Sequence, residues 1–296
     1  MKGRDVADLI MIAAVWGASF LFMRMGAPEF GPLVLVQLRL LTAAIFLLPI
    51  LYLRVGLAEL PGNWKVLTAL GFLNSVIPFL LLTYSTLFVT AGFSSVINAT
   101  APLWGALVAW IWLSERMSKI GVVGLAMGFA GVAVLAGDAE SLASPGSMLA
   151  VAAAVGGAFF YGIGANYAKR YAKQLNSLSV ATGSMLFPAL ILAPLAVYDW
   201  PAVPPSTSAW VAVIAMGIAS TGFAYILYFR LIANVGPTKA ITVAYLIPVF
   251  AVIWGYLILD EAVTPLMITG CLIIFVGTAL VTGVFQRSKT ASGQKP

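Results

Sequence analysis

Long apolar runs constrain this chain more than any other feature. A helix needs about 20 apolar residues to cross the hydrocarbon core of a bilayer, and ten such runs follow one another here. They lie at residues 6–25, 31–54, 63–86, 89–113, 118–137, 146–168, 177–198, 207–230, 238–259 and 264–285. Short polar or Gly/Pro-containing joints separate them. We therefore predict an all-α integral membrane protein with ten transmembrane helices and no extramembrane domain.

Composition agrees with this prediction, because 61% of the residues are hydrophobic and only 9% are charged. A soluble domain carries about 25% charged residues. A water-soluble fold could not bury so much apolar surface, so lipid must be the solvent. The first run follows Lys2 and Arg4, as in a signal peptide. Nine more runs follow, and no small-residue cleavage site ends the first one. We therefore predict that the first run is a transmembrane helix that stays in the mature protein.

The residue types that are missing exclude several chemistries. Cys271 is the single cysteine, which excludes an intramolecular disulfide and a cysteine-based metal site. There is no histidine, the commonest metal ligand and general acid or base. We expect no metal, no cofactor and no catalytic residue. The net charge of +6 is typical of cytoplasmic loops rather than of a nucleic-acid partner. The expected partners are the lipid bilayer and a small-molecule substrate.

The distribution of Lys and Arg predicts the orientation in the membrane. If the N-terminus is cytoplasmic, 14 of the 16 basic residues fall in inner segments. The outer joints then hold Arg24 and an excess of acids: Glu29, Asp138, Glu140, Asp199, Asp260 and Glu261. We predict a multi-pass protein of the cell (inner) membrane with both termini in the cytoplasm.

The two halves of the chain are related in sequence. Residues 13–20 and 153–160 agree at six of eight places, and a second match extends over 35 positions. It pairs Pro102/Pro248, Leu113/Leu259, Glu115/Glu261, Gly124/Gly270, Phe129/Phe275, Gly131/Gly277 and Ala133/Ala279. Each half has an odd number of spans, so the halves must be inverted, a design of secondary transporters. We predict one repeat at 1–137, an inverted repeat at 146–285 and a cytoplasmic tail at 286–296.

Several motifs together resemble a known family. They are the segment from Trp16 to Phe20 (Trp-Gly-Ala-Ser-Phe), an arginine in the second helix, and Pro102 and Pro248 in helices that close on Leu-x-Glu. Over essentially the whole chain, this pattern resembles the EamA-type drug/metabolite transporters. The resemblance implies a ten-helix exporter of small metabolites, with exporters of amino acids, including aromatic ones, as the nearest subgroup. It also implies alternating access around a midplane cavity. No residue identifies the substrate.

Polar side chains inside the spans are the first candidates for that cavity. Arg39 lies well within the second span, about 12 Å from its start at 1.5 Å per residue. It either binds a substrate carboxylate or a gate partner, or it snorkels to the interface and supports packing. Asn74, Asn98 and Asn166 either bind substrate or form hydrogen bonds between helices. No Asp or Glu lies deep in a span, so we expect transport down the substrate gradient rather than strict proton coupling.

Aromatic residues and prolines within the spans complete the set. Mid-span aromatics more often pack than bind ligands, but several together suit an amphipathic or aromatic solute. The predicted aromatic cavity residues are Trp16, Tyr84, Trp104, Tyr161, Tyr225 and Tyr245. Proline frees a backbone carbonyl and kinks a helix, and the predicted bends are at Pro78, Pro102, Pro188 and Pro248.

Glycines predict which helices form the scaffold. Gly121, Gly124, Gly128 and Gly131 in the fifth span, with Gly270 and Gly277 in the tenth, give faces on which helices can approach closely. The same faces could serve a subunit contact. The expected assembly is therefore a monomer or a homodimer.

Other functions make different demands on the residues. A sugar-phosphate or nucleotide-sugar carrier of the same fold would need more cavity Lys or Arg than Arg39 alone. A multidrug carrier of the same fold is a further alternative. An intramembrane enzyme would need a His, Cys or carboxylate cluster at membrane depth, and the sequence has none. A channel would pass solute in both directions without a gating cycle.

Overall fold

Helix is the only secondary structure in the described part of the computed structural model, as expected of a backbone that finds no hydrogen-bond partner in lipid. The structure describes residues 3–138, 142–143, 145–240 and 242–282. The predicted cytoplasmic tail at 286–296 lies outside these residues. The described chain folds into α1 (Gly3–Arg54), α2 (Glu59–Gly62), α3 (Trp64–Gly71), η1 (Phe72–Val76), α4 (Ile77–Ser85), α5 (Ala91–Asn98), α6 (Ala101–Trp112), α7 (Lys119–Ala136), α8 (Ser147–Tyr171), α9 (Ser177–Tyr198), α10 (Thr207–Ala215), η2 (Met216–Phe223), α11 (Ala224–Val235), α12 (Pro237–Ala240), α13 (Val243–Leu259) and α14 (Pro265–Thr282).

The number of membrane crossings agrees with the sequence prediction. Eight helices are long and apolar enough to cross a membrane, and α13 is a shorter apolar helix. The 52-residue α1 counts as two crossings, because Gly31 interrupts it with φ 70° and ψ 159°. Only glycine adopts such a conformation without strain. Within the described residues the chain therefore makes ten crossings, which confirms the predicted all-α, multi-pass class.

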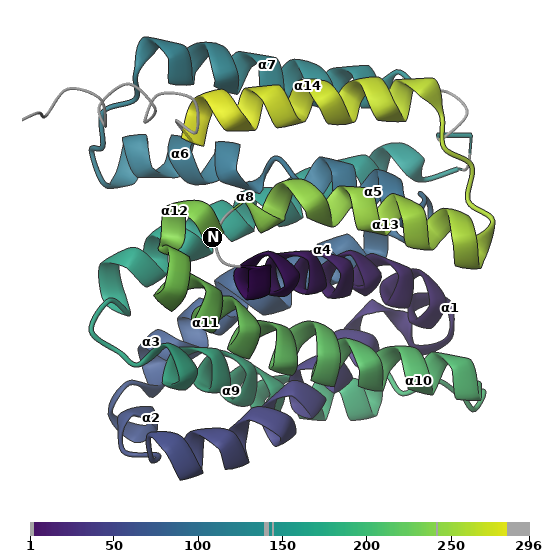
Figure 1. The fold of residues 1–296 in the computed structure, drawn as a ribbon. Helices are drawn as coiled ribbons and strands as arrows, with labels where there is room; N and C mark the ends of the chain where they lie inside the picture. The colour runs from purple at the N-terminus through teal and green to yellow at the C-terminus, as the bar shows by residue number, and fades with distance from the viewer. Residues whose placement is uncertain (1–2, 139–141, 144, 241, 283–296) are drawn as a thin grey trace, which may run out of the picture.

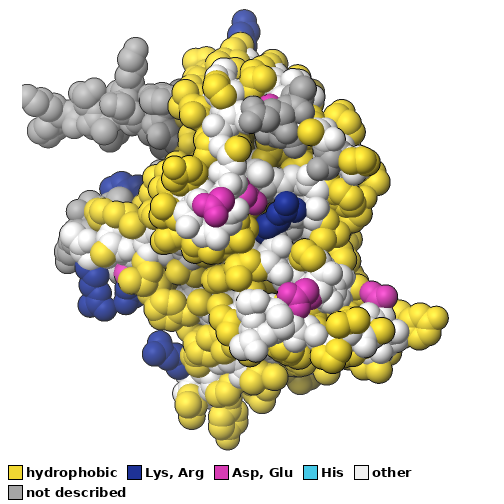
Figure 2. Space-filling view, turned by 90° about the vertical axis from the view of Figure 1, so that its right-hand side faces the viewer, with side chains coloured by type: hydrophobic (Ala, Val, Ile, Leu, Met, Phe, Trp, Pro, Cys, Tyr) yellow, Lys and Arg dark blue, Asp and Glu magenta, His cyan; other side chains and the backbone are white. Residues whose placement is uncertain are grey.

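The helices run in roughly one direction and form a bundle with two distinct ends (Figure 1). The short helices α2 and α12 lie at the left-hand end of this view, and α13 leads into α14 at the right-hand end. Figure 2 looks onto the right-hand end, where carboxylates are scattered over a largely hydrophobic surface. Large apolar side chains such as Leu53 and Tyr198 are 80% and 93% exposed, as expected where lipid is the neighbour. How the two halves are oriented relative to each other stays a prediction.

Helices α7 and α14 pack against each other at one edge of the bundle (Figure 1). Glycines make this approach possible. A Cβ atom at Gly124 would lie 2.6 Å from the Gly277 carbonyl oxygen, and one at Gly131 would lie 3.0 Å from the Gly270 carbonyl oxygen. The prediction of close helix contacts is confirmed for Gly124, Gly128, Gly131, Gly270 and Gly277, whereas a Cβ atom at Gly121 would meet only Met117 and Ser118 of its own segment.

Irregular turns interrupt the helices at matching places in the two halves. The π-helix η1 interrupts the third predicted span, and η2 interrupts the eighth. Pro78 follows η1 at the start of α4. The fourth span breaks between α5 and α6, directly before Pro102 in the first turn of α6. Pro188 and Pro248 lie inside α9 and α13. Such irregularities are frequent at functional sites.

Two carboxylates that the sequence analysis left without a role are buried near the start of α1. The Asp8 carboxylate forms an ion pair with Arg230 of α11, with 2.9 Å between Arg230 Nε and Asp8 Oδ2. Asn234 donates a hydrogen bond to Asp5. These contacts fasten the first helix of the chain to the second half of the bundle.

The glycine contact between α7 and α14 gives a stability prediction. A Cβ atom at Gly277 would lie 2.6 Å from two backbone atoms, the Gly124 oxygen and the Gly128 nitrogen, which cannot rotate away. We expect Gly277→Val to force the helices apart and to destabilise the protein by about 1–3 kcal/mol. Thermal unfolding of the purified protein in detergent measures the change.

Gly105→Ala is the control, because its Cβ would meet nothing closer than the Gly162 Cα at 3.9 Å. An unchanged melting temperature for Gly277→Val would contradict close backbone contact between the two helices.

Candidate functional site

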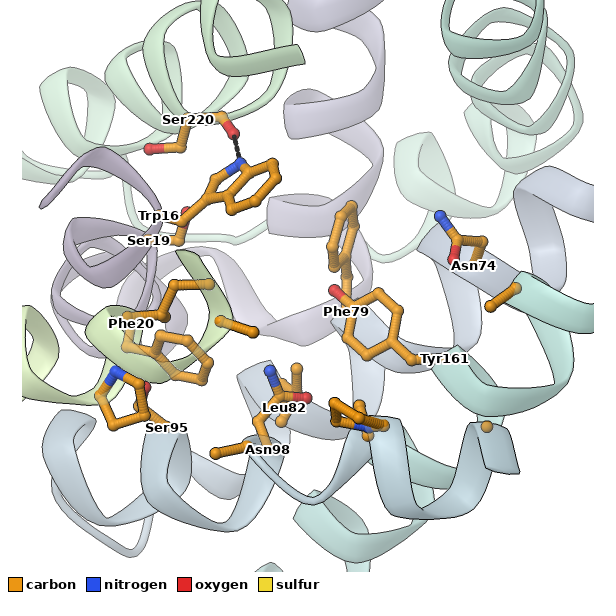
Figure 3. Close-up of a pocket in the computed structure, with 18 of the residues that line it drawn as sticks. Trp16, Ser19, Phe20, Asn74, Phe79, Leu82, Ser95, Asn98, Tyr161 and Ser220 are labelled. Atoms are coloured by element: carbon orange, nitrogen blue, oxygen red, sulfur yellow. Dashed lines mark hydrogen bonds between the residues drawn. The ribbon is translucent and has the colours of Figure 1, made fainter. Parts of the chain in front are cut away.

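One cavity of about 610 Å³ lies in the middle of the bundle. Its wall is formed by α1, η1 with α4, α5 with α6, α8, η2 with α11, α13 and the end of α14, so both halves of the chain contribute. The size falls within the usual range of small-molecule sites, about 300–1,000 Å³. The lining is mostly apolar and aromatic, with a few polar groups (Figure 3).

Most of the predicted site residues meet in this cavity. Seven of them line it: Trp16, Arg39, Asn74, Asn98, Tyr161, Asn166 and Tyr225. Pro102 and Pro248, the related pair of prolines, line it as well. These residues come from positions spread over more than 200 residues of sequence. The sequence analysis selected these residues only because they are polar or aromatic and lie deep within predicted spans. The structure places them around one cavity.

Three predicted aromatic residues lie elsewhere. Tyr84 packs its ring against Phe88, and Trp104 packs against Phe129 and Phe159. Tyr245 shares a hydrogen bond of 3.1 Å with Thr282, which itself lines the cavity. None of the three aromatic side chains is part of the cavity lining. Pro78 and Pro188 also lie outside it.

Arg39 is the charged centre of the cavity. Its side chain is buried, and its Nε donates a 3.0 Å hydrogen bond to the Thr221 hydroxyl in η2. The guanidinium carbon lies 3.6 Å from the centre of the Phe79 ring, a cation–π contact. Among the described residues, the Nη1 atom has no hydrogen-bond partner. Within the described residues no carboxylate forms an ion pair with Arg39, and the cavity lining contains no Asp or Glu.

Trp16 forms the wall opposite Asn74 and Tyr161 in Figure 3. Its indole nitrogen donates a 2.9 Å hydrogen bond to the Ser220 carbonyl in η2, drawn as the dashed line. The π-helical turn frees carbonyls from the regular pattern, so a side chain can bind one of them. Tyr228 packs beside the indole with 5.1 Å between ring centres. Trp16 is therefore held rigidly as a flat apolar surface.

Asn166 forms a hydrogen bond between helices, which is one of the two roles that the sequence analysis gave it. Its amide nitrogen donates 2.8 Å hydrogen bonds to the Gly105 carbonyl of α6 and to the Gly162 carbonyl of its own helix α8. The side chain also borders the cavity. It therefore joins two helices of the wall.

Sequence reasoning missed the small polar residues of the site. Ser19, Ser95 and Ser220 line the cavity, and Thr221 holds Arg39. Serine and threonine are common in membrane helices and give no signal by themselves. Ser95 lies one helical turn before Asn98, and this spacing on one face was the available clue.

A second set of contacts seals the end of the bundle where α13 leads into α14, which we call the Glu261 end. The Glu261 carboxylate accepts the Ala91 N–H at 2.9 and 3.0 Å, at the start of α5. Arg24 of α1 lies 3.6 Å from the same carboxylate and donates to the Thr86 carbonyl. Burial raises the pKa of Glu261, while the Ala91 N–H and Arg24 oppose this shift by stabilising the carboxylate.

A related pair occupies the opposite end, which we call the Lys169 end. Glu115, the repeat partner of Glu261, forms an ion pair with Lys169 in the last turn of α8. Both side chains are about half exposed, whereas Glu261 is only 10% exposed. The cavity lining includes Lys169 but neither Arg24 nor Glu261. The cavity therefore reaches Lys169 but does not reach the contacts of Arg24 and Glu261.

Comparison with known proteins gives matches over nearly the full chain. The EamA-like transporter family matches twice, at residues 7–137 and 148–283. A solved crystal structure of a protein superposes with a TM-score of 0.68 at 19% identity, covering 98% of this chain and 100% of that one. That likeness concerns the fold alone.

Curated relatives are named as transporters. The uncharacterized transporter YoaV of Bacillus subtilis is 26% identical and covers 95% of this chain and 97% of its own length. The uncharacterized inner membrane transporter YedA of Escherichia coli is 28% identical over 83% and 80%. A probable terminal-alkyne amino-acid exporter of Streptantibioticus cattleyicolor is 24% identical over 94% and 93%.

The contacts at the Glu261 end give a prediction about access. Glu261→Gln keeps the shape of the side chain but removes its charge, so the attraction to Arg24 and part of the bond to Ala91 are lost. A hydrogen bond to a charged group contributes about 1.5–3 kcal/mol, and 1.4 kcal/mol is a tenfold change in an equilibrium. We expect access to the cavity from the Glu261 end to rise about tenfold.

Cysteine labelling measures this access. The parent protein carries Cys271→Ala, which removes the single cysteine, and Met23→Cys, a buried cavity residue, as the reporter. A membrane-impermeant maleimide is added to intact cells and to inverted vesicles, so that each end is probed separately. Glu115→Gln, at the Lys169 end, is the matched control and should leave access from the Glu261 end unchanged. Equal labelling rates for the parent and Glu261→Gln would contradict the seal.

Proposed function

Because this chain belongs to the EamA-like transporter family, we propose that it is a secondary transporter that exports small metabolites bearing a carboxylate. Amino acids with aromatic or other hydrophobic side chains are the proposed substrates, and alternating access is the proposed mechanism. The observation that carries this proposal is Arg39, a buried cation with an unpaired nitrogen and no carboxylate beside it in the cavity lining.

A buried arginine without a counter-ion is costly and usually has a function. The protein offsets part of this cost with the Thr221 hydroxyl and the Phe79 ring. Neither contact neutralises the charge. A guanidinium binds a carboxylate through parallel N–H donors, and Arg39 keeps a donor free for it. A substrate carboxylate would supply both the missing hydrogen bond and the missing charge.

The walls of the cavity suit the rest of an amino acid. Trp16, Phe20, Phe79, Tyr161 and Tyr225 supply aromatic surface around Arg39. Such surface favours an apolar or aromatic side chain over a sugar or a phosphate. The relative named as a probable amino-acid exporter supports the same substrate class.

Alternating access is supported by the difference between the two ends. The Glu261 end holds a buried carboxylate that the cavity does not reach, while the cavity reaches Lys169 at the other end. Basic residues predict that the Lys169 end, with both termini, faces the cytoplasm. Glu115 and Glu261 occupy equivalent places of the two halves. We propose that during transport the Glu261 end opens while the Lys169 end closes, so that the cavity is accessible from one end at a time.

The functional unit proposed here is the monomer. Residues of one chain line the cavity and form the Arg24–Glu261 and Lys169–Glu115 ion pairs at its two ends. The contact between α7 and α14 leaves their outer faces exposed, with side chains such as Val122 and Leu272 pointing away from the bundle. These faces are compatible with lipid and also with a second copy, and neither changes the site.

The proposed role of Arg39 is tested by export assays. Arg39→Gln removes the charge, so substrate transport in proteoliposomes should fall at least about tenfold, since a charged contact is worth about 1.5–3 kcal/mol. Export of radiolabelled amino acids, with competition by other metabolites, gives both the rate and the substrate class.

Arg54→Gln is the matched control, because Arg54 is an exposed cation at the end of the same helix, away from the cavity. It should transport like the parent protein. Size-exclusion profiles and melting temperatures of both variants report whether the fold is retained. Normal transport by a folded Arg39→Gln variant would reject Arg39 as the substrate ligand.

A further inference from the structure

A second polar region lies in the cavity wall formed by α5. Ser95 and Asn98 are three residues apart and therefore share one face of this helix. Both line the cavity, and Figure 3 shows them projecting from the same helix, with Phe79 and Tyr161 across the space. The candidate region consists of these two side chains and the end of α5, which stops at Asn98.

Both side chains carry an acceptor without a partner. The Ser95 hydroxyl oxygen and the Asn98 carbonyl oxygen Oδ1 are buried and make no hydrogen bond to any residue that the structure describes. Ser95 is only 1% exposed. Buried polar atoms in folded proteins are nearly always paired, so an unpaired pair on one wall of a cavity points to a ligand.

The backbone adds a third acceptor at the same place. In a regular helix the Asn98 carbonyl would accept the N–H of the residue four positions later, but that residue is Pro102, which has none. The C-terminal end of a helix also carries a partial negative charge. The break between α5 and α6 therefore concentrates oxygen acceptors and negative potential in one part of the wall.

Asn166 shows what a packing asparagine in this bundle does. Its amide is used in two 2.8 Å hydrogen bonds to carbonyls of α6 and α8. The Oδ1 atom of Asn98 makes none. Asn166 therefore uses its amide donor in packing, whereas Asn98 has a buried amide acceptor that no described residue pairs.

We propose that Ser95, Asn98 and the freed Asn98 carbonyl form a subsite for the substrate's ammonium group. An ammonium has three N–H donors and no acceptor, and the Ser95 hydroxyl oxygen, the Asn98 Oδ1 atom and the Asn98 backbone carbonyl can each accept one of them. This inference rests on the proposed function, in which Arg39 binds the carboxylate. It makes the transporter selective for zwitterionic amino acids over simple carboxylic acids.

The absence of a carboxylate from the cavity lining is part of this assignment. Arg39 and a substrate carboxylate neutralise each other, whereas an acidic side chain in the lining would carry a negative charge that pairs with Arg39 in the empty cavity and competes with the substrate carboxylate for it. Neutral oxygens at a helix end can bind a cation without carrying that charge. A carboxylic acid without an amine would leave these oxygens unpaired, at a cost of about tenfold in affinity.

The test compares ligands that differ only in the amino group. Binding of L-phenylalanine and 3-phenylpropionate, and of L-leucine and 4-methylpentanoate, is measured by calorimetry on the purified protein. Equilibrium binding avoids the passive leak of free acids through vesicles. We expect the parent protein to bind at least one amino acid about tenfold more tightly than its deaminated analogue.

Variants of the subsite then separate recognition of the ammonium group from recognition of the carboxylate. Asn98→Leu and Ser95→Ala should weaken amino-acid binding about tenfold and leave binding of the analogue unchanged, so the preference disappears. Ser94→Ala is the matched control, since Ser94 is a buried, unpaired serine of the same helix outside the cavity lining. It should keep the preference. Arg39→Gln should weaken binding of both ligands.

The possible outcomes distinguish a failure of the ammonium subsite from a failure of the proposed export function. If Asn98→Leu and Ser95→Ala fold normally and keep the full preference for the amino acid, the subsite is wrong while the exporter proposal stands. The same holds if the parent binds both ligands equally and Arg39→Gln weakens both. If the folded parent protein binds neither amino acids nor their analogues, both proposals are rejected.

Discussion

In lipid every backbone N–H and C=O must find its hydrogen-bond partner inside the protein, because no water is available to bind an unpaired group. Regular helices satisfy this requirement within each segment, and most of this chain consists of them. The exceptions are therefore informative. The π-helices η1 and η2 and the break between α5 and α6 all border the cavity. The irregular backbone lies where a ligand or a side chain can form hydrogen bonds with the freed carbonyl groups.

The same constraint explains how much could be predicted from the sequence. Ten apolar runs were enough to predict the crossings, because each helix is built from local residues. The glycine contacts of α7 and α14 were also predicted, since small residues at helical spacing have few other uses in lipid. The continuous path of α1 through Gly31 was not, because a single glycine between apolar residues does not reveal its φ angle.

The site was predicted in part. Arg39, Asn74 and Asn98 are polar groups at membrane depth, and such groups must face the interior of a bundle. Depth does not say which side of a helix a residue occupies. Tyr84 and Trp104 have suitable depth but pack against Phe88, Phe129 and Phe159 instead. Ser95 and Thr221 were missed, because their roles depend on which neighbours the fold brings to them.

Gly31 joins the first two helices of the chain without a loop. Arg24, which takes part in the seal, lies seven residues before it, and Arg39, in the cavity, lies eight residues after it. At 1.5 Å per residue these two cations are about 10 Å and 12 Å from the glycine. A change in the torsion angles of this one residue would tilt both arms about a common pivot. The lever arms are nearly equal, so a displacement of the Arg39 guanidinium in the cavity would be matched in size by a displacement of the Arg24 guanidinium beside Glu261.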